Sequence, residues 1–529
     1  MTITAKQIES FRSAVLNCDA DACTSFLRDA ESAQFANYKL LIAFHDALLL
    51  LEAYPCSQDL YERAVHLLRT FENLTKRFIR KNKSAVEKLV NSGLKGTEAQ
   101  GSFTFPLIQL LSGHSPESVY IHSFGDEGKS LNDVLRHFLP KTEFETLDAG
   151  YDTDELFNEL FGKQNQLQAL VNSMCRSSVP ESVRDALFDD LKMFAGIKFD
   201  GKIPERSVAR GPERGIFIHS DIQRKPIPLD VVNRGLPSPV ILTKEQQSAL
   251  QIQCASMLAS LNRETDPVSL CADDGITLFE LERGVSVALF SMKPGRRLPL
   301  DSYIGYVLFK NRVPHAYGGA WLFGNRALFG INIFEPFRGG ESSLTILQLL
   351  RVYRQCYGIS AFSVEPYQYG LDNPEGIESG AYWFYYKMGF RSDEAKLSDL
   401  AEKEVAKMQK KGTYRTSHAT LRKFTASNIT WKIDDVKLLP NPADVSRATT
   451  EFIRKHYQGN REKCIQDLNQ FHGLKRGEVP DEYLVTFLWQ KNSVVSRLYV
   501  NLVKQLAIAK HANERQYNQL LHSLYANIQ

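Results

Sequence analysis

Arg338, Gly339 and Gly340 form a turn whose residue types could bind an anion. They follow the mostly apolar run Leu328–Phe334 and precede Ser342–Tyr357, which has helical spacing. Glycine adopts backbone angles closed to other residues, so that consecutive N–H groups of such a turn can point at one spot. A helix that starts there adds free N–H groups and the positive end of its dipole. The sequence therefore predicts a cradle of the size of a phosphate group.

One βαβ unit is expected to position this turn. Leu328–Phe334 has the pattern of a short buried strand, and Ile359–Val364 is typical of the next strand. Gly358 is a suitable end for the intervening helix. Apolar residues recur on one face of that helix: Ile346, Leu350, Tyr353 and Tyr357. Because ligands of open α/β units bind beyond the carboxyl ends of the strands, the turn lies where a site is expected.

A short aromatic helix closes the region with Tyr385-Tyr386-Lys387-Met388-Gly389-Phe390. With the Arg turn, this ending resembles the core of the GNAT superfamily of acyl-coenzyme A (acyl-CoA) N-acyltransferases, over about residues 275–391. In that family a strand ends in an Arg/Gln-x-x-Gly-x-Gly/Ala turn that holds the pyrophosphate of coenzyme A. A later helix ends in Tyr-x-x-x-Gly-Phe. Arg338 fits the first position of the turn, and Ala381 stands where the family often has alanine.

The resemblance implies acetyl-CoA or another acyl-CoA as cosubstrate and assigns roles to residues around the turn. Backbone N–H groups of about Asn332 to Phe334 would polarise the thioester carbonyl as charge builds on its oxygen. Tyr385 matches the tyrosine that often protonates the leaving sulfur, although a helix so rich in aromatic residues is also ordinary core filling. The residues expected to bind the cosubstrate are Asn332, Ile333, Phe334, Arg338, Gly339, Gly340, Ser342 and Ser343.

Polar residues beside the turn are candidates for catalysis and for binding the acceptor. Glu335 lies at the strand end, where a buried carboxylate would have a raised pKa and could act as a base. The alternative for Glu335 is an ion pair with Arg338 or a helix cap. The loop after the second strand offers aromatic, amide and carboxylate groups that either face a small polar acceptor or are turn chemistry. These residues are Tyr367, Gln368, Asp372 and Asn373.

Two positions of the turn differ from the family pattern, because Glu341 and Ser343 stand where small residues belong. A carboxylate at Glu341 that faced the cradle would repel a pyrophosphate. The sequence therefore supports two hypotheses. The first is an acyl-CoA-dependent N-acyltransferase that acts on an unidentified amine, on a small molecule or a protein. The second is a GNAT-like domain without catalysis that serves as a binding or scaffolding module.

The fold class expected for the whole chain is α+β, a GNAT-like mixed sheet domain flanked by helical regions. Residues 1–200 are predicted to be mainly helical, 201–243 to be a proline-rich linker, 244–433 to be the GNAT-like domain and 434–529 to be helical. Tyr303–Phe309 and Ala316–Phe323 resemble strands, with a hairpin turn at Asn311-Arg312. The helical regions could supply a surface for a protein partner.

A second motif, GDEGKS at residues 125–130, nearly spells a phosphate-binding P-loop. The first glycine position is occupied by Ser123, and Asp126 and Glu127 would bring negative charge to the cradle. The alternative is a solvated turn in which Ser130 caps a helix. A nucleotide-dependent protein is therefore a third hypothesis.

Composition narrows the class of protein. The net charge of +3 does not argue for nucleic acid or an acidic membrane as a partner. No signal peptide is expected from the polar stretch at residues 1–10, and the most apolar stretch, residues 40–54, is too short to span a bilayer. Eight scattered cysteines without a CxxC pair suggest neither a metal site nor a disulfide framework. A cytoplasmic setting is expected.

Overall fold

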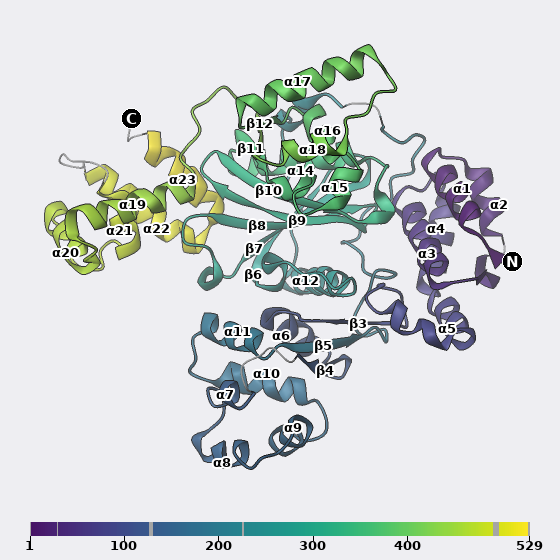
Figure 1. The fold of residues 1–529 in the computed structure, drawn as a ribbon, viewed down its shortest axis with the longest axis horizontal. Helices are drawn as coiled ribbons and strands as arrows, with labels where there is room; N and C mark the ends of the chain where they lie inside the picture. Colours follow the sequence, from purple (N-terminus) through teal and green to yellow (C-terminus); the bar gives the residue numbers. More distant parts are fainter. Residues whose placement is uncertain (1, 29, 126–130, 225–226, 490–496, 527–529) are drawn as a thin grey trace.

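The computed structural model describes residues 2–28, 30–125, 131–224, 227–489 and 497–526. Its centre is a mixed sheet of eight strands, with helices on both faces and helical regions at either side (Figure 1). The predicted α+β class is therefore confirmed at the level of a mixed sheet with helical regions around it.

The central sheet has the strand order β12-β13-β11-β10-β9-β8-β7-β6. Neighbours are antiparallel except β10 and β11, which are parallel and joined by α14. The strands are β6 (Cys271–Glu280), β7 (Val285–Met292), β8 (Ser302–Lys310), β9 (Val313–Phe323), β10 (Arg326–Ile333), β11 (Ala361–Val364), β12 (Arg391–Ser392) and β13 (Ile429–Lys432).

The turn between β8 and β9 consists of Asn311 and Arg312, as predicted. Both residues have positive φ angles, 46° and 71°, as a two-residue turn of type I′ requires. The hairpin turn was thus correctly predicted from the sequence, and it brings Lys310 and Arg312 to one end of the sheet.

Both faces of the central sheet are covered. Ala288 and Phe290 on β7 join the core under α12, whereas Val287 and Leu289 join the core under α14. Figure 1 shows α14 to α18 on one face and α12 on the other. The helices around the sheet are α12 (Lys244–Ala259), α13 (Asp266–Ser269), α14 (Ser342–Tyr357), α15 (Pro374–Glu378), α16 (Ala381–Lys387), α17 (Ala395–Lys410) and α18 (His418–Phe424).

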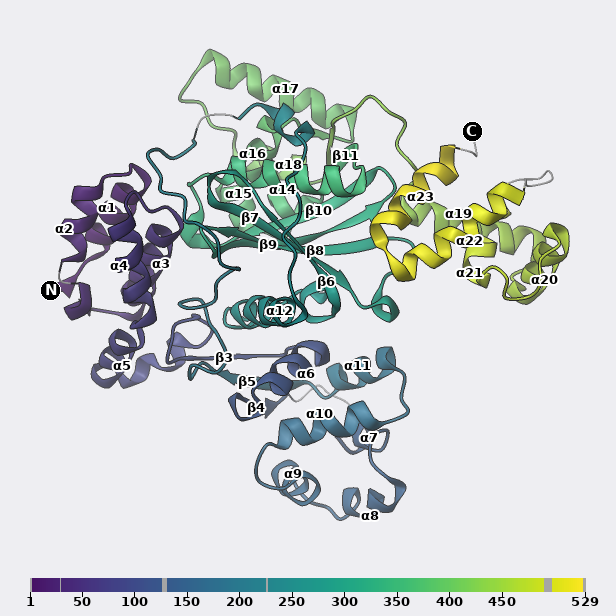
Figure 2. The ribbon, with the colours of Figure 1, turned by 180° about the vertical axis from the view of Figure 1, so that it is seen from behind.

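The N-terminal region contains two parts: one lies beside an end of the central sheet, and the other lies beyond α12 (Figures 1 and 2). The first holds β1 (Thr2–Ile3), β2 (Gln34–Phe35), α1 (Ala5–Leu16), α2 (Ala20–Leu27), α3 (Tyr38–Ala53), α4 (Gln58–Arg69) and α5 (Glu72–Lys81). The second surrounds a sheet of order β3-β5-β4, with β3 (Glu98–Gly101), β4 (Val119–Phe124) and β5 (Met193–Lys198). Its helices are α6 (Phe105–His114), α7 (Leu131–Leu135), α8 (Phe144–Leu147), α9 (Thr153–Phe161), α10 (Gln166–Arg176) and α11 (Glu181–Asp190).

In this small sheet, the segment Ser118–Phe124 has the sequence pattern of a strand, and β4 forms there. Helical spacing predicts a helix up to Phe194, but α11 ends at Asp190 and Phe194 lies in β5. Lys192, between them, has a positive φ of 50°, which breaks the helix.

The predicted linker at residues 201–243 is buried at some positions and exposed at others. Among its described residues only Leu229–Asn233 is helical, a short 3-10 turn, as the prolines suggest. Residues 203–223, which we call the strap, nevertheless reach the interior at several positions. Buried side chains of the strap are Ile203, Glu205, Arg206, Ser207, Ala209 and His219. The prolines thus correctly indicate an irregular backbone in this segment, but they do not indicate whether its side chains are buried.

The C-terminal region is helical and packs on the end of the sheet. Asn518 donates to the carbonyl oxygens of Gly324, 2.6 Å away, and Tyr357, 2.9 Å away. Its helices are α19 (Pro442–Tyr457), α20 (Arg461–His472), α21 (Asp481–Phe487), α22 (Arg497–Ala512) and α23 (Glu514–Ala526). Across the described residues, no helix combines the length and the apolar character needed to cross a membrane.

Candidate functional site

Strands β10 and β11 diverge beside the Arg-Gly-Gly turn. Their pairing ends at Leu328 and Ser363, although β10 continues to Ile333. The N–H group of Phe334 donates to the carbonyl of His315, 3.1 Å away on the β9 side. Because N–H directions alternate along a strand, the N–H groups of odd-numbered residues such as Ile333 face the opposite side. Of the three predicted carbonyl-polarising amides, that of Ile333 therefore faces the gap, and that of Phe334 is already engaged.

The side chain of Gln368 covers part of this free strand edge. Its Oε1 accepts a hydrogen bond from the N–H of Ile331 at 3.2 Å. Its Nε2 lies 3.2 Å from the position that a Cβ atom on Gly330 would take, so a larger residue at 330 would crowd it. A ligand that paired with β10 at Ile331 would have to displace the Gln368 carboxamide.

The predicted turn keeps free N–H groups on its open side. Gly339 is exposed, has φ +85° and would place an added Cβ in open space. The backbone N–H groups of Gly339, Ser342 and Ser343 have no hydrogen-bond partner among the described residues. Gly340 differs, because its N–H donates to Phe337 at 3.2 Å. The turn and the first residues of α14 thus offer unpaired donors, as an anion site requires.

The carboxylate of Glu341 points into the protein interior and is completely buried. Its Oε2 lies 2.6 Å from Nζ of Lys310, and its Oε1 lies 2.6 Å from Nη2 of Arg283. Oε1 also accepts from the N–H of Gln223 on the strap at 2.9 Å. Burial opposes ionisation, but the two cations hold the pKa of Glu341 at about 2. The negative charge of Glu341 therefore lies in the interior, where Lys310 and Arg283 neutralise it, and does not face the cradle.

A buried polar network surrounds Glu341 and joins three parts of the chain. The hydroxyl of Tyr54, from the end of α3, accepts from the N–H of Glu341 at 3.4 Å and lies 3.1 Å from Nε2 of His315. His219 of the strap lies 3.9 Å from Oε2 of Glu341. Burial lowers the pKa of both histidines to about 3, so both are neutral at neutral pH. Sequence reasoning missed this network; its only local signal is Lys310, a charge that ends an apolar strand.

Arg338 and Glu335 do not pair with each other. Arg338 is exposed, and its Nη2 lies 3.1 Å from Oε2 of Glu375, which is also exposed. The carboxylate of Glu335 lies on the surface, so the burial that was expected to make it a base is absent. Glu335 contributes a backbone contact instead, since its carbonyl accepts from the N–H of Arg338 at 3.3 Å.

Tyr385 lies on α16, with its ring against those of Phe384 and Phe390. Its phenol is within electrostatic range of the phenols of Tyr306 and Tyr369, and its charge would raise the pKa of each. Tyr306 donates to the carbonyl of Gly330 on β10 at 2.8 Å, whereas Tyr369 follows β11. The Tyr385 hydroxyl has no hydrogen-bond partner among the described residues, and burial raises its pKa. Tyr385 is therefore protonated at neutral pH, as a proton donor must be.

Part of the loop that was predicted to bind the acceptor stabilises the fold instead. Asn373 caps α15, since its Oδ1 accepts from the N–H of Gly376 at 3.4 Å and its Nδ2 donates to the carbonyl of Tyr367 at 2.9 Å. Tyr367 and Asp372 are exposed, and Asp372 has a positive φ of 52°. Of the four predicted residues, Tyr367 and Asp372 thus have exposed side chains that an acceptor could reach.

The P-loop-like motif falls largely outside the described residues, which omit 126–130. Gly125 is described, and its N–H donates to the carbonyl of Lys192 at 2.8 Å. Within the described ranges, no group of three or more His, Cys, Asp or Glu side chains is arranged to hold a metal ion.

Comparison with known proteins gives no relative for this chain: no family model matches it, and searches of curated proteins and of solved structures find no similar protein. The resemblance to the GNAT superfamily therefore rests on the residues and motifs themselves.

Proposed function

We propose that the protein is an acyl-CoA-dependent N-acyltransferase in which the turn of residues 338–343 binds the diphosphate of the cosubstrate. One observation carries the proposal: β10 and β11 part beside a turn whose N–H groups at Gly339, Ser342 and Ser343 are free. The inward orientation of Glu341 supports it, because that carboxylate is neutralised by Lys310 and Arg283. A diphosphate would meet free N–H donors at the start of α14 instead of an opposing charge.

Acyl transfer in this site would use two groups. The amine nitrogen attacks the thioester carbonyl, and the N–H group of Ile333 is the free strand donor that could bind the resulting oxyanion. The C–S bond then breaks, and Tyr385 gives its proton to the leaving thiolate. The attacking amine releases a proton to water, and solvent returns a proton to Tyr385. The products are an amide and free coenzyme A.

Two contacts favour the alternative, a binding or scaffolding module without catalysis. Gln368 covers the strand edge at Ile331, and Arg338 is paired with Glu375 across the turn. In that case coenzyme A would bind weakly or not at all, and no free thiol would appear from acetyl-CoA with any amine. Thiol release with a panel of primary amines and polyamines separates the two functions.

Arg338→Ala is expected to weaken acetyl-CoA binding by about tenfold or more, because a guanidinium–phosphate contact contributes roughly 1.5–3 kcal/mol. The measurement is isothermal titration calorimetry of the full chain. Arg447→Ala is the matched control, since Arg447 is another exposed arginine in a single ion pair, 3.1 Å from Asp444 on α19. Equal affinities of the Arg338→Ala and Arg447→Ala variants for acetyl-CoA would show that the diphosphate does not bind at this turn.

A further inference from the structure

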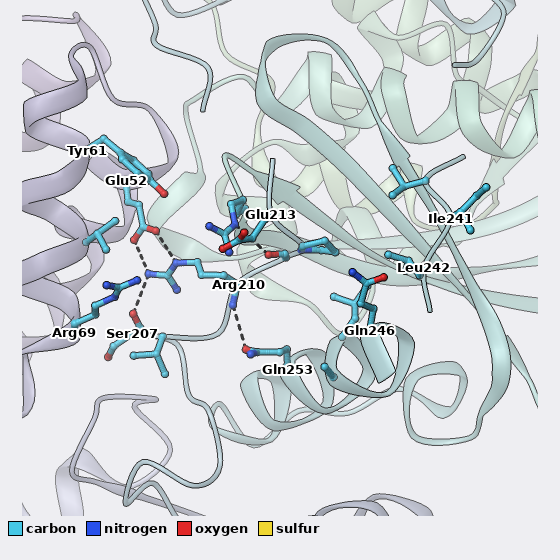
Figure 3. A pocket seen from close by; sticks show the side chains of 18 residues that line it. Glu52, Tyr61, Arg69, Ser207, Arg210, Glu213, Ile241, Leu242, Gln246 and Gln253 are labelled. Carbon is cyan, nitrogen blue, oxygen red and sulfur yellow. Dashed lines mark hydrogen bonds and ion pairs between the residues drawn. The ribbon is translucent and has the colours of Figure 1, made fainter. Parts of the chain in front are cut away.

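A second polar cleft lies between the N-terminal helices, the strap and α12, apart from the turn of residues 338–343. Its volume is about 560 Å³, within the range of small-molecule sites. In Figure 3, Tyr61 and Arg69 reach it from the N-terminal helices, and Gln246 and Gln253 reach it from α12. Three arginines line it, Arg69, Arg210 and Arg312, against two acidic residues, Glu52 and Glu213.

Arg210 is a fixed part of the wall and not a free cation. Its Nε and Nη2 lie 2.6 and 2.5 Å from the two carboxylate oxygens of Glu52, which is 1% exposed. The remaining N–H groups of Arg210 donate to the carbonyl oxygens of Arg206, Ser207 and Ala209. All five donors of the guanidinium are therefore used, and the Arg210–Glu52 pair adds no net charge to the cleft.

The other two arginines keep free donors toward the cleft. The side chain of Arg69 has no hydrogen-bond or ion-pair partner among the described residues. Over the ranges that the structure describes, Arg312 uses only its Nε, which donates to the carbonyl of Gly211 at 3.2 Å. Glu213 is exposed and forms no ion pair with either of them in the described part of the chain. Two guanidinium groups thus face one free carboxylate, which leaves the lining positive.

Tyr61 lines the cleft together with these cations. Burial and the charge of Glu52 raise the pKa of its phenol and outweigh Arg312, Arg210 and Arg69, which favour the ionised form. The Tyr61 hydroxyl has no hydrogen-bond partner among the described residues and adds a further donor to the cleft.

An apolar wall faces these donors. Val240, Leu242 and Leu250 line the cleft, and Ile241 at its edge is 95% exposed. Figure 3 shows Ile241 and Leu242 on the side of the cleft opposite Tyr61 and Arg69. A ligand that matched both sides would carry an anionic group at one end and an apolar group at the other.

We propose that this cleft binds a small organic anion, with a carboxylate or phosphate held by Arg69, Arg312 and Tyr61 and an apolar body against Val240, Leu242 and Leu250. Arginine forks fit either anion, because both present two oxygens in a plane. The site is independent of acyl transfer, since none of these residues lies in the turn of residues 338–343 or in the gap beside it.

The test is calorimetry of the full chain with 4-phenylbutyrate, phenyl phosphate and the neutral 4-phenylbutyramide. We expect both anions to bind and the amide to bind at least about tenfold more weakly, because only the anions engage the two guanidinium groups. The two anions distinguish a carboxylate site from a phosphate site. Arg69→Gln and Arg312→Gln are each expected to weaken the preferred anion about tenfold. Arg447→Gln, far from the cleft on α19, is the control and should bind like the wild type.

Three outcomes would overturn the proposal. The first is the absence of binding by both anions at low-millimolar concentration. The second is equal binding of 4-phenylbutyrate and its amide, which would leave no role for charge. The third is unchanged affinity in both arginine variants. Arg69 is exposed and Gln is a good helix residue, so that Arg69→Gln is expected to fold and to report on binding.

Discussion

Glu341→Gln is expected to lower the free energy of unfolding by about 3–5 kcal/mol, because it leaves Lys310 and Arg283 without their buried counter-ion. The carboxylate is fully buried and lies 2.6 Å from each cation. Urea unfolding of wild type and variant measures the difference. Glu375→Gln is the control, since its ion pair with Arg338 is exposed and should contribute less than about 1 kcal/mol.

Acid provides an independent test of the same ion pairs. The pKa of Glu341 falls from a usual value of 4.5 to about 2 in the folded state. A carboxyl group with a depressed folded pKa contributes stability above its unfolded pKa and loses it as the pH falls through the folded pKa. The wild type should therefore lose this stability between about pH 4.5 and pH 2, whereas Glu341→Gln should lose less over that window. Equal acid profiles, or a loss below about 1 kcal/mol for Glu341→Gln, would contradict the buried network.

Tyr385→Phe is expected to lower kcat for acyl transfer about a hundredfold, with little change in the KM for acyl-CoA, because general acid catalysis contributes that much. The phenyl ring retains the packing of Tyr385 against Phe390, whose ring centroid is 5.6 Å away. The measurement is the rate of thiol release from acetyl-CoA with the best amine of the panel.

Tyr386→Phe on the same helix is the matched control for Tyr385→Phe. Tyr386 is half-buried, and its ring lies 3.7 Å under the guanidinium of Arg391, a contact that phenylalanine preserves. We expect Tyr386→Phe to keep the wild-type rate. A Tyr385→Phe variant as active as Tyr386→Phe would exclude the tyrosine as proton donor.

Local signals predicted the elements that carry the turn. Helix α14 spans Ser342–Tyr357, as its periodicity and the glycines at both ends indicate, and Gly358 adopts the left-handed conformation with φ 72°. The Asn311-Arg312 hairpin followed from its turn residues for the same reason. Periodicity, glycine and turn chemistry act over a few residues, so one sequence suffices to find them.

The interior around Glu341 could not be predicted, because it depends on contacts between distant parts of the chain. Tyr54 approaches Glu341 from 287 positions away, and Gln223 of the strap approaches it from 118 positions away. The sequence does not show which way the carboxylate of Glu341 points. Its ion pairs with Lys310 and Arg283 in the structure show that it points inward. The contact between Gln223 of the strap and Glu341 could not be predicted either, because an irregular backbone has no periodicity from which burial could be inferred.

The same contacts explain why a helical region accompanies the sheet. Tyr54 at the end of α3 and His219 of the strap lie beside Glu341, the residue before α14. Lys310, Arg283 and Gln223 bind the carboxylate of Glu341 in the interior, and the N–H groups of Ser342 and Ser343 have no partner among the described residues. The N-terminal helices thus help to shape the proposed anion site, although they contribute no residue to its open side.

Hydrogen exchange of the backbone amides with and without coenzyme A tests the central claim most directly. The account predicts that coenzyme A slows exchange at Gly339, Ser342 and Ser343, and that pantetheine, which lacks the diphosphate, does not slow it there. Unchanged exchange at these three amides under saturating coenzyme A, or the absence of any binding, would contradict the account.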